Sequence, residues 1–529
     1  MQSQKHGFFA WKMIILLGIT LLLFFWMNPS FFSRFLTLKS FIGRGVFLLT
    51  FLMAWGALLA CAIARRIWAA LFLLFFAVNL FISVTYARVM GRAMTLNDAQ
   101  NLREAMGSTP DAVHQYWSTV WVVALAIMAM VALILLVRTQ IRKRNNLPLM
   151  ACSLGITLSY GAFLARGGAG AMLFFPANFE SSLHALALSA EPLIRHRTPR
   201  DEQPIPIIKE PINPSVKHVV LIIDESIEAN VFQEAMKGIR IENAKNLGIG
   251  YSFGNNSPSS NLMLRRLADP SLPDQSIRQF PSVFELAKQQ GFTTTYLDAQ
   301  GVLSDRDVQD YFDAKDTKFI DNIPPLKEYG PRHQRDINAM RILLDVLPKQ
   351  EKSFILVNKQ GIHFPYLQNL PPEMASVPDP YRTSVERTSI NFLVGIAPHL
   401  PPGTLVFYTS DHGQNFHGRA PHNNMAGECS VSEWQVPIVI LYSPDMKAWA
   451  ERISPQWQNC AAHSTIAESV RNLFGERNPS ASSFLTQPTF EDVAMDRVCL
   501  GSPKGLFGEP ILSLWINKQS QTFMIPPKK

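Results

Sequence analysis

Cysteine is scarce in this chain, with five residues among 529. So few cysteines cannot staple a fold of this length, which excludes the class of disulfide-rich domains. Charge is scarce as well: 17% of the residues are charged and 47% are hydrophobic, whereas globular proteins carry about 25% charged residues. This composition excludes a disordered or collagen-like chain and favours a membrane protein.

Acidic residues are nearly absent from the first third of the chain. Residues 1–165 contain 3 Asp or Glu against 14 Lys or Arg, whereas residues 166–529 contain 38 against 35. The net charge of +8 therefore arises wholly among apolar runs. Basic residues beside apolar runs set the orientation of a membrane protein. They are not the basic face of a soluble nucleic-acid-binding domain, so no nucleic-acid partner is expected.

Five stretches lack any charged residue and are long enough to cross a bilayer, which needs about 20 apolar residues. They are residues 13–33, 45–64, 67–87, 117–137 and 147–165. The alternative for each is a buried helix in a soluble core. The first is not a cleaved signal peptide, because its apolar run continues through Phe31 and Phe32 without a small-residue cleavage site. We predict a transmembrane domain of five helices over residues 1–165.

Lys and Arg in the connecting segments indicate the orientation of these spans. With a cytoplasmic N-terminus, eight such charges lie in short inside segments, at Lys5, Lys12, Arg65-Arg66 and the basic cluster 138–144. Six lie in the longer outside segments. The difference favours a cytoplasmic N-terminus, and five spans then place everything after about residue 166 outside the cytoplasm.

Residues 166–215 are predicted to be a juxtamembrane and proline-rich linker, because prolines favour an extended tether. From residue 216 to 529 the pattern alternates between strand and helix. Strands are predicted at 218–224, 292–298, 353–358, 404–411 and 436–443, and helices at 282–291, 334–348 and 464–475. This alternation predicts a doubly wound α/β domain with a mostly parallel sheet. Such sheets bind ligands at the carboxyl ends of their strands.

Acids and histidines follow several of these predicted strands. One strand ends in Asp224-Glu225-Ser226 and another in Asp411-His412-Gly413. Three further histidines lie close behind strand ends: His363, His417 and His422. The first motif alone could be a helix N-cap, but carboxylates and imidazoles are ligands that zinc prefers. Their joint placement at one edge of the sheet predicts a metal site.

The segment GNNSPSSNLMLRR (254–266) offers three hydroxyls, those of Ser257, Ser259 and Ser260. A nearby metal can lower the pKa of a serine hydroxyl and make it a nucleophile. The alternative is an ordinary turn, which this Ser, Pro and Asn composition also favours.

These motifs resemble those of the alkaline phosphatase–sulfatase superfamily, and specifically those of the bacterial phosphoethanolamine transferases. The Gly-Glu-Ser/Thr motif of that family, whose Glu binds zinc, is matched by Asp224-Glu225-Ser226. Its Gly-Ser-His-Gly-Pro is matched by 361–365 around His363, and its Ser-Asp-His-Gly-Glu by 410–414 around Asp411-His412. A later histidine, before a strand that begins Val-Pro, is best matched by His422.

The nucleophile of that family is usually a threonine that precedes a small residue by three, and Ser257 with Ser260 fits this spacing. The Cys-Gly-Thr context of the family is missing, so Ser259 is a rival nucleophile. Asp224 and Gln414 replace a glycine and a glutamate of the family motifs. The formylglycine signature of sulfatases is absent, which argues against a sulfatase.

The resemblance implies a zinc-dependent transferase of the bacterial inner membrane with a periplasmic catalytic domain. Glu225, Asp411, His412 and Ser257 would bind one or two Zn²⁺ ions. Ser257 would attack phosphatidylethanolamine and carry the phosphoethanolamine to lipid A or a periplasmic glycan. His363 and His422 would stabilise charge, donate a proton to the leaving group or bind a second metal.

Other functions fit the same sequence. A phosphoglycerol transferase or a phosphodiesterase would share the fold, and a catalytically inactive, membrane-tethered sensor could bind lipid or a partner. The retained acids, histidines and serine argue against an inactive protein, whereas the replaced glycine and glutamate keep that alternative open.

Cysteines outside the predicted spans could form a disulfide. Cys61 and Cys152 lie inside spans, but Cys429, Cys460 and Cys499 fall outside the cytoplasm in the predicted topology, where disulfides form. Three cysteines allow at most one internal bridge, and we predict Cys460–Cys499.

Overall fold

The structure is a computed structural model of the chain. It describes residues 2–529 except 30, 39, 92, 95–97, 100, 101, 103–108, 142, 143, 172–180, 188–206, 210–212, 302–315, 364, 419, 420, 423, 425–428, 480, 501–511 and 525–529. Much of the predicted linker at 166–215 therefore lies outside the described residues. The chain divides into two compact units, one consisting mainly of Met1–Pro199 and the other of Arg200–Lys504 with Pro510–Lys529.

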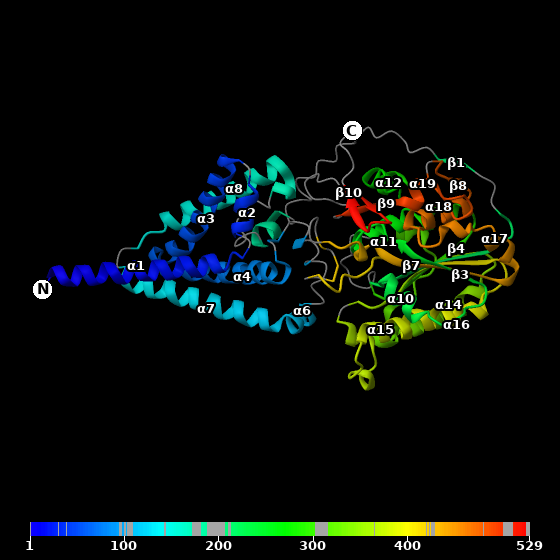
Figure 1. Ribbon diagram of the computed structural model, residues 1–529. Helices are drawn as coiled ribbons and strands as arrows, with labels where there is room; N and C mark the ends of the chain where they lie inside the picture. The colour runs from blue at the N-terminus through cyan, green and yellow to red at the C-terminus, as the bar shows by residue number, and fades with distance from the viewer. Residues whose placement is uncertain are drawn as a thin grey trace. The chain divides into compact units, whose positions relative to one another are not determined.

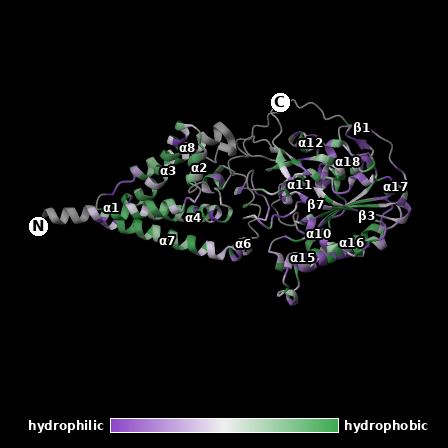
Figure 2. Ribbon diagram, viewed as in Figure 1, coloured by the Kyte–Doolittle hydropathy of each residue, from purple (hydrophilic) through white to green (hydrophobic). Residues whose placement is uncertain are grey.

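The first unit is helical (Figure 1). Its helices are α1 (Gln2–Trp26), α2 (Phe31–Thr37), α3 (Phe41–Ile63), α4 (Arg66–Met90), α6 (Thr109–Gln115), α7 (Trp117–Gln140) and α8 (Leu147–Ala171). Figure 2 shows that hydrophobic residues dominate the long ones. By length and composition, α3, α4 and α7 could cross a membrane. The apolar parts of α1 and α8, Trp11–Trp26 and Leu147–Ala162, are shorter, so three of the five predicted spans are supported and the other two stay predictions.

The first predicted span differs from the structure in its course. The sequence analysis predicts one unbroken span over 13–33, but in the structure α1 ends at Trp26 and α2 begins at Phe31. The break falls at Asn28 and Pro29, because proline restricts the residue before it and cannot continue a helix. Across this break, the Phe25 and Phe31 rings pack edge to face with centroids 4.9 Å apart.

The second unit is built on a six-stranded sheet with the order β3-β7-β6-β2-β5-β4 (Figure 1). The strands are β2 (His218–Asp224), β3 (Ala244–Tyr251), β4 (Thr293–Asp298), β5 (Ser353–Asn358), β6 (Thr404–Ser410) and β7 (Gln435–Tyr442). As the sequence predicts, most are parallel: β4, β5, β2 and β6 run in one direction. Strand β7 runs in the opposite direction to both of its neighbours, β3 and β6. Ile223 of β2 pairs with Asn358 and with Thr409, so three strands end at the same level.

Apolar side chains leave β2 alternately toward two faces, as the period of a strand requires. Val219, Leu221 and Ile223 join one apolar cluster, and Val220 and Ile222 join another. The first cluster is covered by α11 (Ser257–Arg265), α13 (Val283–Gln289), α17 (Lys447–Glu451) and α18 (His463–Leu473). The second is covered by α10 (Ala229–Ala235), α14 (Arg335–Val346), α15 (Pro380–Ser384) and α16 (Asn391–Ile396). The unit is therefore a doubly wound α/β domain.

Several smaller elements complete this unit. A three-stranded antiparallel sheet consists of β9 (Met495–Leu500), β10 (Leu512–Asn517) and β11 (Thr522–Met524), and β1 (Ile208–Lys209) pairs with β8 (Glu476–Arg477). Two short helices are α12 (Pro273–Gln279) and α19 (Phe490–Ala494). Between α15 and α16 the helix widens into a π-helix over Val385–Ile390. The sequence analysis predicts neither the small sheets nor this wide turn.

None of the five cysteines is in a disulfide bond, so the predicted Cys460–Cys499 bridge is wrong. The Cys460 thiol is turned toward the carbonyl of Gln456, one turn earlier, at 2.9 Å. Cys499 lies within β9, opposite Ser513 of β10. Both cysteines are buried in the apolar core, where they pack as small hydrophobic residues.

A buried ion pair joins the ends of β2 and β5. The Lys359 ammonium contacts the Asp224 carboxylate, and both side chains are fully buried. Asp224 Oδ2 also accepts hydrogen bonds from the hydroxyls of Ser389 and Tyr408, both at 2.8 Å. Lys359 donates in turn to the Thr388 carbonyl at 2.9 Å. Asp224 occupies the position of the glycine in the family motif that this chain resembles. Its charge is balanced by a buried lysine, and it directly precedes the predicted metal ligand Glu225.

Substitution of Lys359 should destabilise the second unit strongly. Lys359→Met leaves Asp224 buried without its counter-charge, and removal of one partner of a buried pair costs about 3–5 kcal/mol. Lys349→Met is the matched control, because Lys349 pairs with Asp345 on the exposed surface and such pairs contribute about 0–1 kcal/mol. The denaturant midpoint of the full-length protein, followed by tryptophan fluorescence, measures both. Equal shifts for the two variants would contradict this role of Lys359.

Candidate active site

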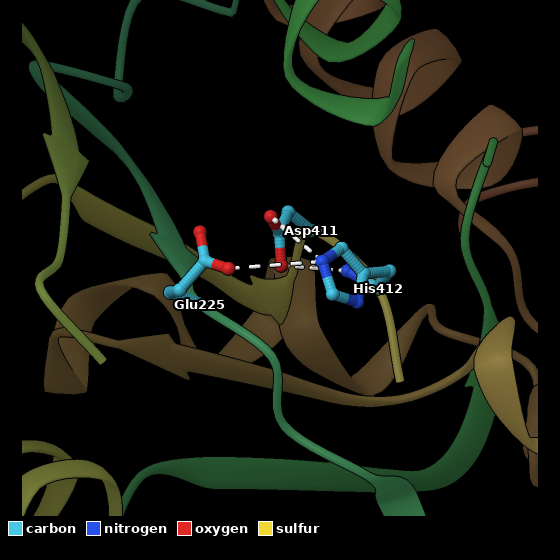
Figure 3. A group of neighbouring side chains, drawn as sticks. All are labelled: Glu225, Asp411 and His412. Atoms are coloured by element: carbon cyan, nitrogen blue, oxygen red, sulfur yellow. Dashed lines mark hydrogen bonds and ion pairs between the residues drawn. The ribbon is translucent and has the colours of Figure 1, made fainter. Parts of the chain in front are cut away.

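Glu225, Asp411 and His412 meet at the carboxyl end of the sheet (Figure 3). Glu225 follows β2, whereas Asp411 and His412 follow β6, its neighbour in the sheet. One ligand atom of each side chain lies within 4.8 Å of the others. His412 Nε2 is 3.6 Å from Glu225 Oε1 and 3.6 Å from Asp411 Oδ2. All three side chains are buried, so this group could hold a metal ion.

The backbone selects the nitrogen of His412 that faces the carboxylates. His412 Nδ1 lies 2.8 Å from the Gly413 carbonyl, which can only accept, so Nδ1 carries the proton and Nε2 keeps its lone pair. Burial lowers the pKa of His412 and favours the neutral ring. A neutral imidazole with a fixed tautomer is the form that ligates metals.

Asp411 is the residue that most needs a cation. Its Oδ1 accepts from the backbone nitrogens of Ser226 at 2.9 Å and of His412 at 2.7 Å. Its Oδ2 is buried and has no hydrogen-bond partner among the described residues, which is costly for a carboxylate. Burial and the nearby charge of Glu225 raise the pKa of Asp411 well above its usual value. A divalent ion would allow both carboxylates to ionise and would satisfy Oδ2, so the residues fit a metal.

Glu225 is the ionised member of this pair of acids. Burial opposes its charge, but His363 and His412 hold the pKa of Glu225 at about 2. Its oxygens accept from the Ser226 hydroxyl at 2.7 Å and from the Gln300 amide at 3.0 Å. The sequence analysis did not single out Gln300. Its position just after β4 was the available signal, since β4 ends at the same edge of the sheet.

Ser257 lies beside the metal-ligating group. It is the first residue of α11, whose N-cap is Asn256. The Ser257 hydroxyl oxygen is 3.2 and 3.3 Å from the two carboxylate oxygens of Glu225 and 3.3 Å from His412 Nε2. The structure thus brings together the predicted nucleophile and the predicted metal ligands.

The other two serines of this segment hold its turn. The Ser259 hydroxyl donates to the Asn256 side chain at 2.7 Å. The Ser260 hydroxyl donates to the Gly254 carbonyl at 3.1 Å and accepts from the Gly254 nitrogen at 2.9 Å. Ser257 is therefore the serine whose hydroxyl lies beside the acid and the histidine of the site.

The remaining predicted histidines lie in different surroundings. The ring of His422 is 4.4 Å from that of His412, and its Nδ1 is buried without a hydrogen-bond partner in the described part of the chain. Burial and the proximity of His412 lower the pKa of His422 well below its usual value. His363 is half-buried and acts on Glu225 through its charge. His417 is exposed, and its backbone nitrogen donates to the Asn415 side chain at 3.2 Å.

Two glycines of the motifs are required by close approach. A Cβ on Gly361, whose φ is +54°, would lie 2.5 Å from the Glu225 nitrogen. A Cβ on Gly413 would lie 2.1 Å from the Ser432 carbonyl oxygen. The close approach of the segment that leads into β7 therefore explains the glycine at position 413.

Two buried residues that the sequence analysis missed position the site. Glu433 accepts from the Asn255 side chain at 2.9 Å and from the Asn424 nitrogen at 3.1 Å, so it links the segment of Ser257 to that of His422. His463 accepts from the Phe253 nitrogen at 3.1 Å and lies 2.9 Å from the Ser410 carbonyl. It therefore joins the approach to Ser257 to the end of β6.

Comparison with known proteins supports the fold of this site. Residues 248–475 match the sulfatase family model. The integral membrane protein lipooligosaccharide phosphoethanolamine transferase A (EptA) from Neisseria meningitidis is similar at 14% identity and a TM-score of 0.58, over 88% of this chain and 96% of that chain. The C-terminal periplasmic domain of EcEptC from Escherichia coli, in complex with Zn, is similar at 15% identity and a TM-score of 0.47. The match covers 60% of this chain and 97% of that chain.

No curated protein matches the chain. The predicted sulfatase-type domain is supported by the family match over residues 248–475, and the fold that the resemblance implies is found in a membrane-anchored phosphoethanolamine transferase. At these identities the likeness concerns the fold.

Asp411→Asn should abolish metal binding by the full-length protein. The substitution keeps the shape of the side chain but removes the charge that a divalent ion requires, and the remaining ligands cannot close the coordination shell. Elemental analysis after dialysis against zinc gives the metal content per chain. Asp345→Asn, on the exposed surface, is the control and should retain the content of the unmodified protein. A full metal content in Asp411→Asn would refute this assignment.

Proposed function

We propose that this chain is a zinc-dependent transferase that moves phosphoethanolamine from phosphatidylethanolamine to an envelope acceptor, lipid A or a periplasmic glycan. The observation that carries the proposal is the position of Ser257, whose hydroxyl lies within 3.3 Å of both Glu225 and His412. A nucleophile in contact with a metal-ligating group is what a two-step phosphoryl transfer requires.

Zinc suits the side chains that are present. Two carboxylates, one neutral imidazole and the Ser257 hydroxyl would provide four ligands for the ion, of types that zinc accepts. The bound ion would supply positive charge that lowers the pKa of the serine hydroxyl and neutralises the phosphoryl oxygens. His363 and His422 lie near enough to the metal-ligating residues to interact with their charges. The two histidines could therefore either transfer protons or bind a second ion.

The chain's own residues account for both halves of the reaction. Ser257 Oγ, whose proton would leave to solvent because the ion lowers its pKa, forms a bond to the phosphorus of the donor as the bond from phosphorus to the diacylglycerol oxygen breaks. The leaving oxygen takes a proton from His363, and phosphoethanolamine remains as a diester on Ser257. His422, which is neutral because it is buried, then accepts the proton of the acceptor hydroxyl. The acceptor oxygen attacks phosphorus and releases Ser257 as its oxyanion, and the proton that His422 gained passes through solvent to His363, which restores the starting state.

A lipid donor explains why the soluble unit follows apolar helices. Diacylglycerol and its phosphodiester stay in the bilayer, so an enzyme that uses them benefits from a membrane anchor. Helices α3, α4 and α7 are long and apolar enough to provide one. We propose that the chain consists of a transmembrane domain over 1–165, a linker over 166–215 and a catalytic domain over 216–529. The charge asymmetry of the first segment supports a periplasmic catalytic domain on the bacterial inner membrane.

Ser257→Ala should reduce transfer at least about a thousand-fold, because loss of a covalent nucleophile removes the first step. Ser259→Ala is the matched control. It removes one hydrogen bond to Asn256, worth about 1 kcal/mol, and should leave most activity. The protein is incubated with phosphatidylethanolamine or, in parallel, phosphatidylglycerol, and the adduct is located by peptide mass spectrometry. An adduct on Ser259 would move the nucleophile, an adduct from phosphatidylglycerol alone would change the donor, and no adduct from either would contradict transfer.

The predicted topology can be measured separately from activity. An alkaline phosphatase reporter, which is active only outside the cytoplasm, should be active when fused after residue 215 and inactive when fused after the Arg65-Arg66 turn. The reason is that basic residues in short segments stay on the cytoplasmic side. The reverse pattern of activity would show that the catalytic domain faces the cytoplasm and would remove lipid A and periplasmic glycans as acceptors.

A further inference from the structure

The helical unit contains a pocket in which arginines gather. The pocket has a volume of about 560 Å³ and lies where α3 ends, α4 begins and α7 ends. It is lined by Arg65, Arg66, Leu135, Arg138, Thr139 and Arg144. It belongs to the helical unit and shares no residue with the group around Ser257.

No acidic residue balances these four arginines from the neighbouring chain. Residues 1–97 and 112–165 contain neither Asp nor Glu, and these ranges include all the helices that line the pocket. Four guanidinium groups around one cavity repel one another, since arginine stays charged at any physiological pH. A bound anion would remove this repulsion.

Two of the arginines are held in place by the end of α3. Arg138 donates to the carbonyls of Cys61 at 3.1 Å and Ala64 at 2.7 Å, and Arg144 donates to that of Ala62 at 2.7 Å. The last carbonyls of a helix attract cations, so these side chains are oriented before any ligand arrives. Arg65 and Arg66 are exposed, and their guanidinium groups donate no hydrogen bond within the part of the chain that the structure describes.

The pocket adjoins an apolar surface. Leu135, one of its lining residues, is 47% exposed, and Ile67 and Trp68 in the first turn of α4 are 74% and 50% exposed. Tryptophan beside basic residues is typical of the boundary between headgroups and acyl chains. A ligand that uses both features carries a negative charge on one end and acyl chains on the other.

We infer that this pocket binds the phosphate of an anionic phospholipid, with the arginines around the phosphate and the acyl chains along α4 and α7. Guanidinium groups bind phosphate oxygens through paired hydrogen bonds, and basic pockets between membrane helices are suited to anionic headgroups. Phosphatidylethanolamine, whose ammonium offsets its phosphate, fits less well. The inference is independent of the proposed transfer, because the two sites share no residue.

The test uses the full-length protein in nanodiscs that contain equal amounts of phosphatidylglycerol and phosphatidylethanolamine. After release from the nanodiscs, native mass spectrometry measures the ratio of the lipids that remain bound. One basic side chain near an anionic surface changes binding roughly five-fold, so Arg65→Gln with Arg66→Gln should lower the retained phosphatidylglycerol roughly twenty-five-fold. Arg66→Gln alone should lower it roughly five-fold.

Arg44→Gln is the matched control for the single variant. Arg44 lies near the other end of α3, where it donates to the Leu38 carbonyl at 2.8 Å, and it does not line the pocket. Its substitution should leave the lipid ratio unchanged. A thermal unfolding curve of each variant checks that the helical unit is intact, and Arg66→Lys, which keeps the charge, is a second variant that should retain more lipid than Arg66→Gln.

Three outcomes would overturn the inference. Equal retention in the unmodified protein and the double variant would mean that the pocket holds no lipid. An equal loss in Arg44→Gln would mean that the net charge of the helices, not this pocket, attracts anionic lipid. Inorganic phosphate is added in a parallel series to distinguish the source of the bound phosphate. If the protein retains inorganic phosphate and shows no preference between the two lipids, the pocket binds a soluble phosphate and not a phospholipid.

Discussion

Two buried carboxylates that cannot both ionise without a cation are the constraint around which the soluble unit is organised. Glu225 and Asp411 follow neighbouring strands, and the register of those strands brings them together whatever their charges. Ser226 holds both, because its hydroxyl donates to Glu225 and its nitrogen donates to Asp411. It does so in the left-handed region, with a φ of 62°, a conformation that costs a non-glycine residue free energy. The conformational strain thus lies where the two acids are fixed.

The sequence predicted the parallel core because buried strands leave continuous runs of Val, Ile and Leu, as in β2 and β5. It could not predict that β7 runs antiparallel, since hydrophobicity has no direction. Strand β3 was missed because its sequence, AKNLGIGY, has two glycines and little apolar alternation. In the helical unit, hydropathy located the apolar runs, but it does not register the break at Pro29 that ends α1 early.

The candidate site was predictable where residue type and strand ends coincide, as for Glu225, Asp411, His412 and Ser257. Glu433 and His463 carried no such signal, because their roles depend on contacts with segments far away in the sequence. Asp224 shows the limit of the same reasoning. Two adjacent acids suggested one metal site, but the first faces Lys359, which lies 135 residues later, and only the folded sheet brings that lysine to it.

The π-helix at Val385–Ile390 has a consequence for how this fold tolerates change in length. Its wide turn presents the Thr388 carbonyl to Lys359 and the Ser389 hydroxyl to Asp224. Successive residues of a helix are rotated by about 100° around its axis. Deletion of one residue here would give a regular helix, but it would turn either the residues before or those after the deletion away from the charges they now meet. The extra residue of the π-helix therefore fixes the rotation of α15 relative to α16 about the helix axis. Insertions or deletions should be better accepted in the loops that flank these two helices than within them.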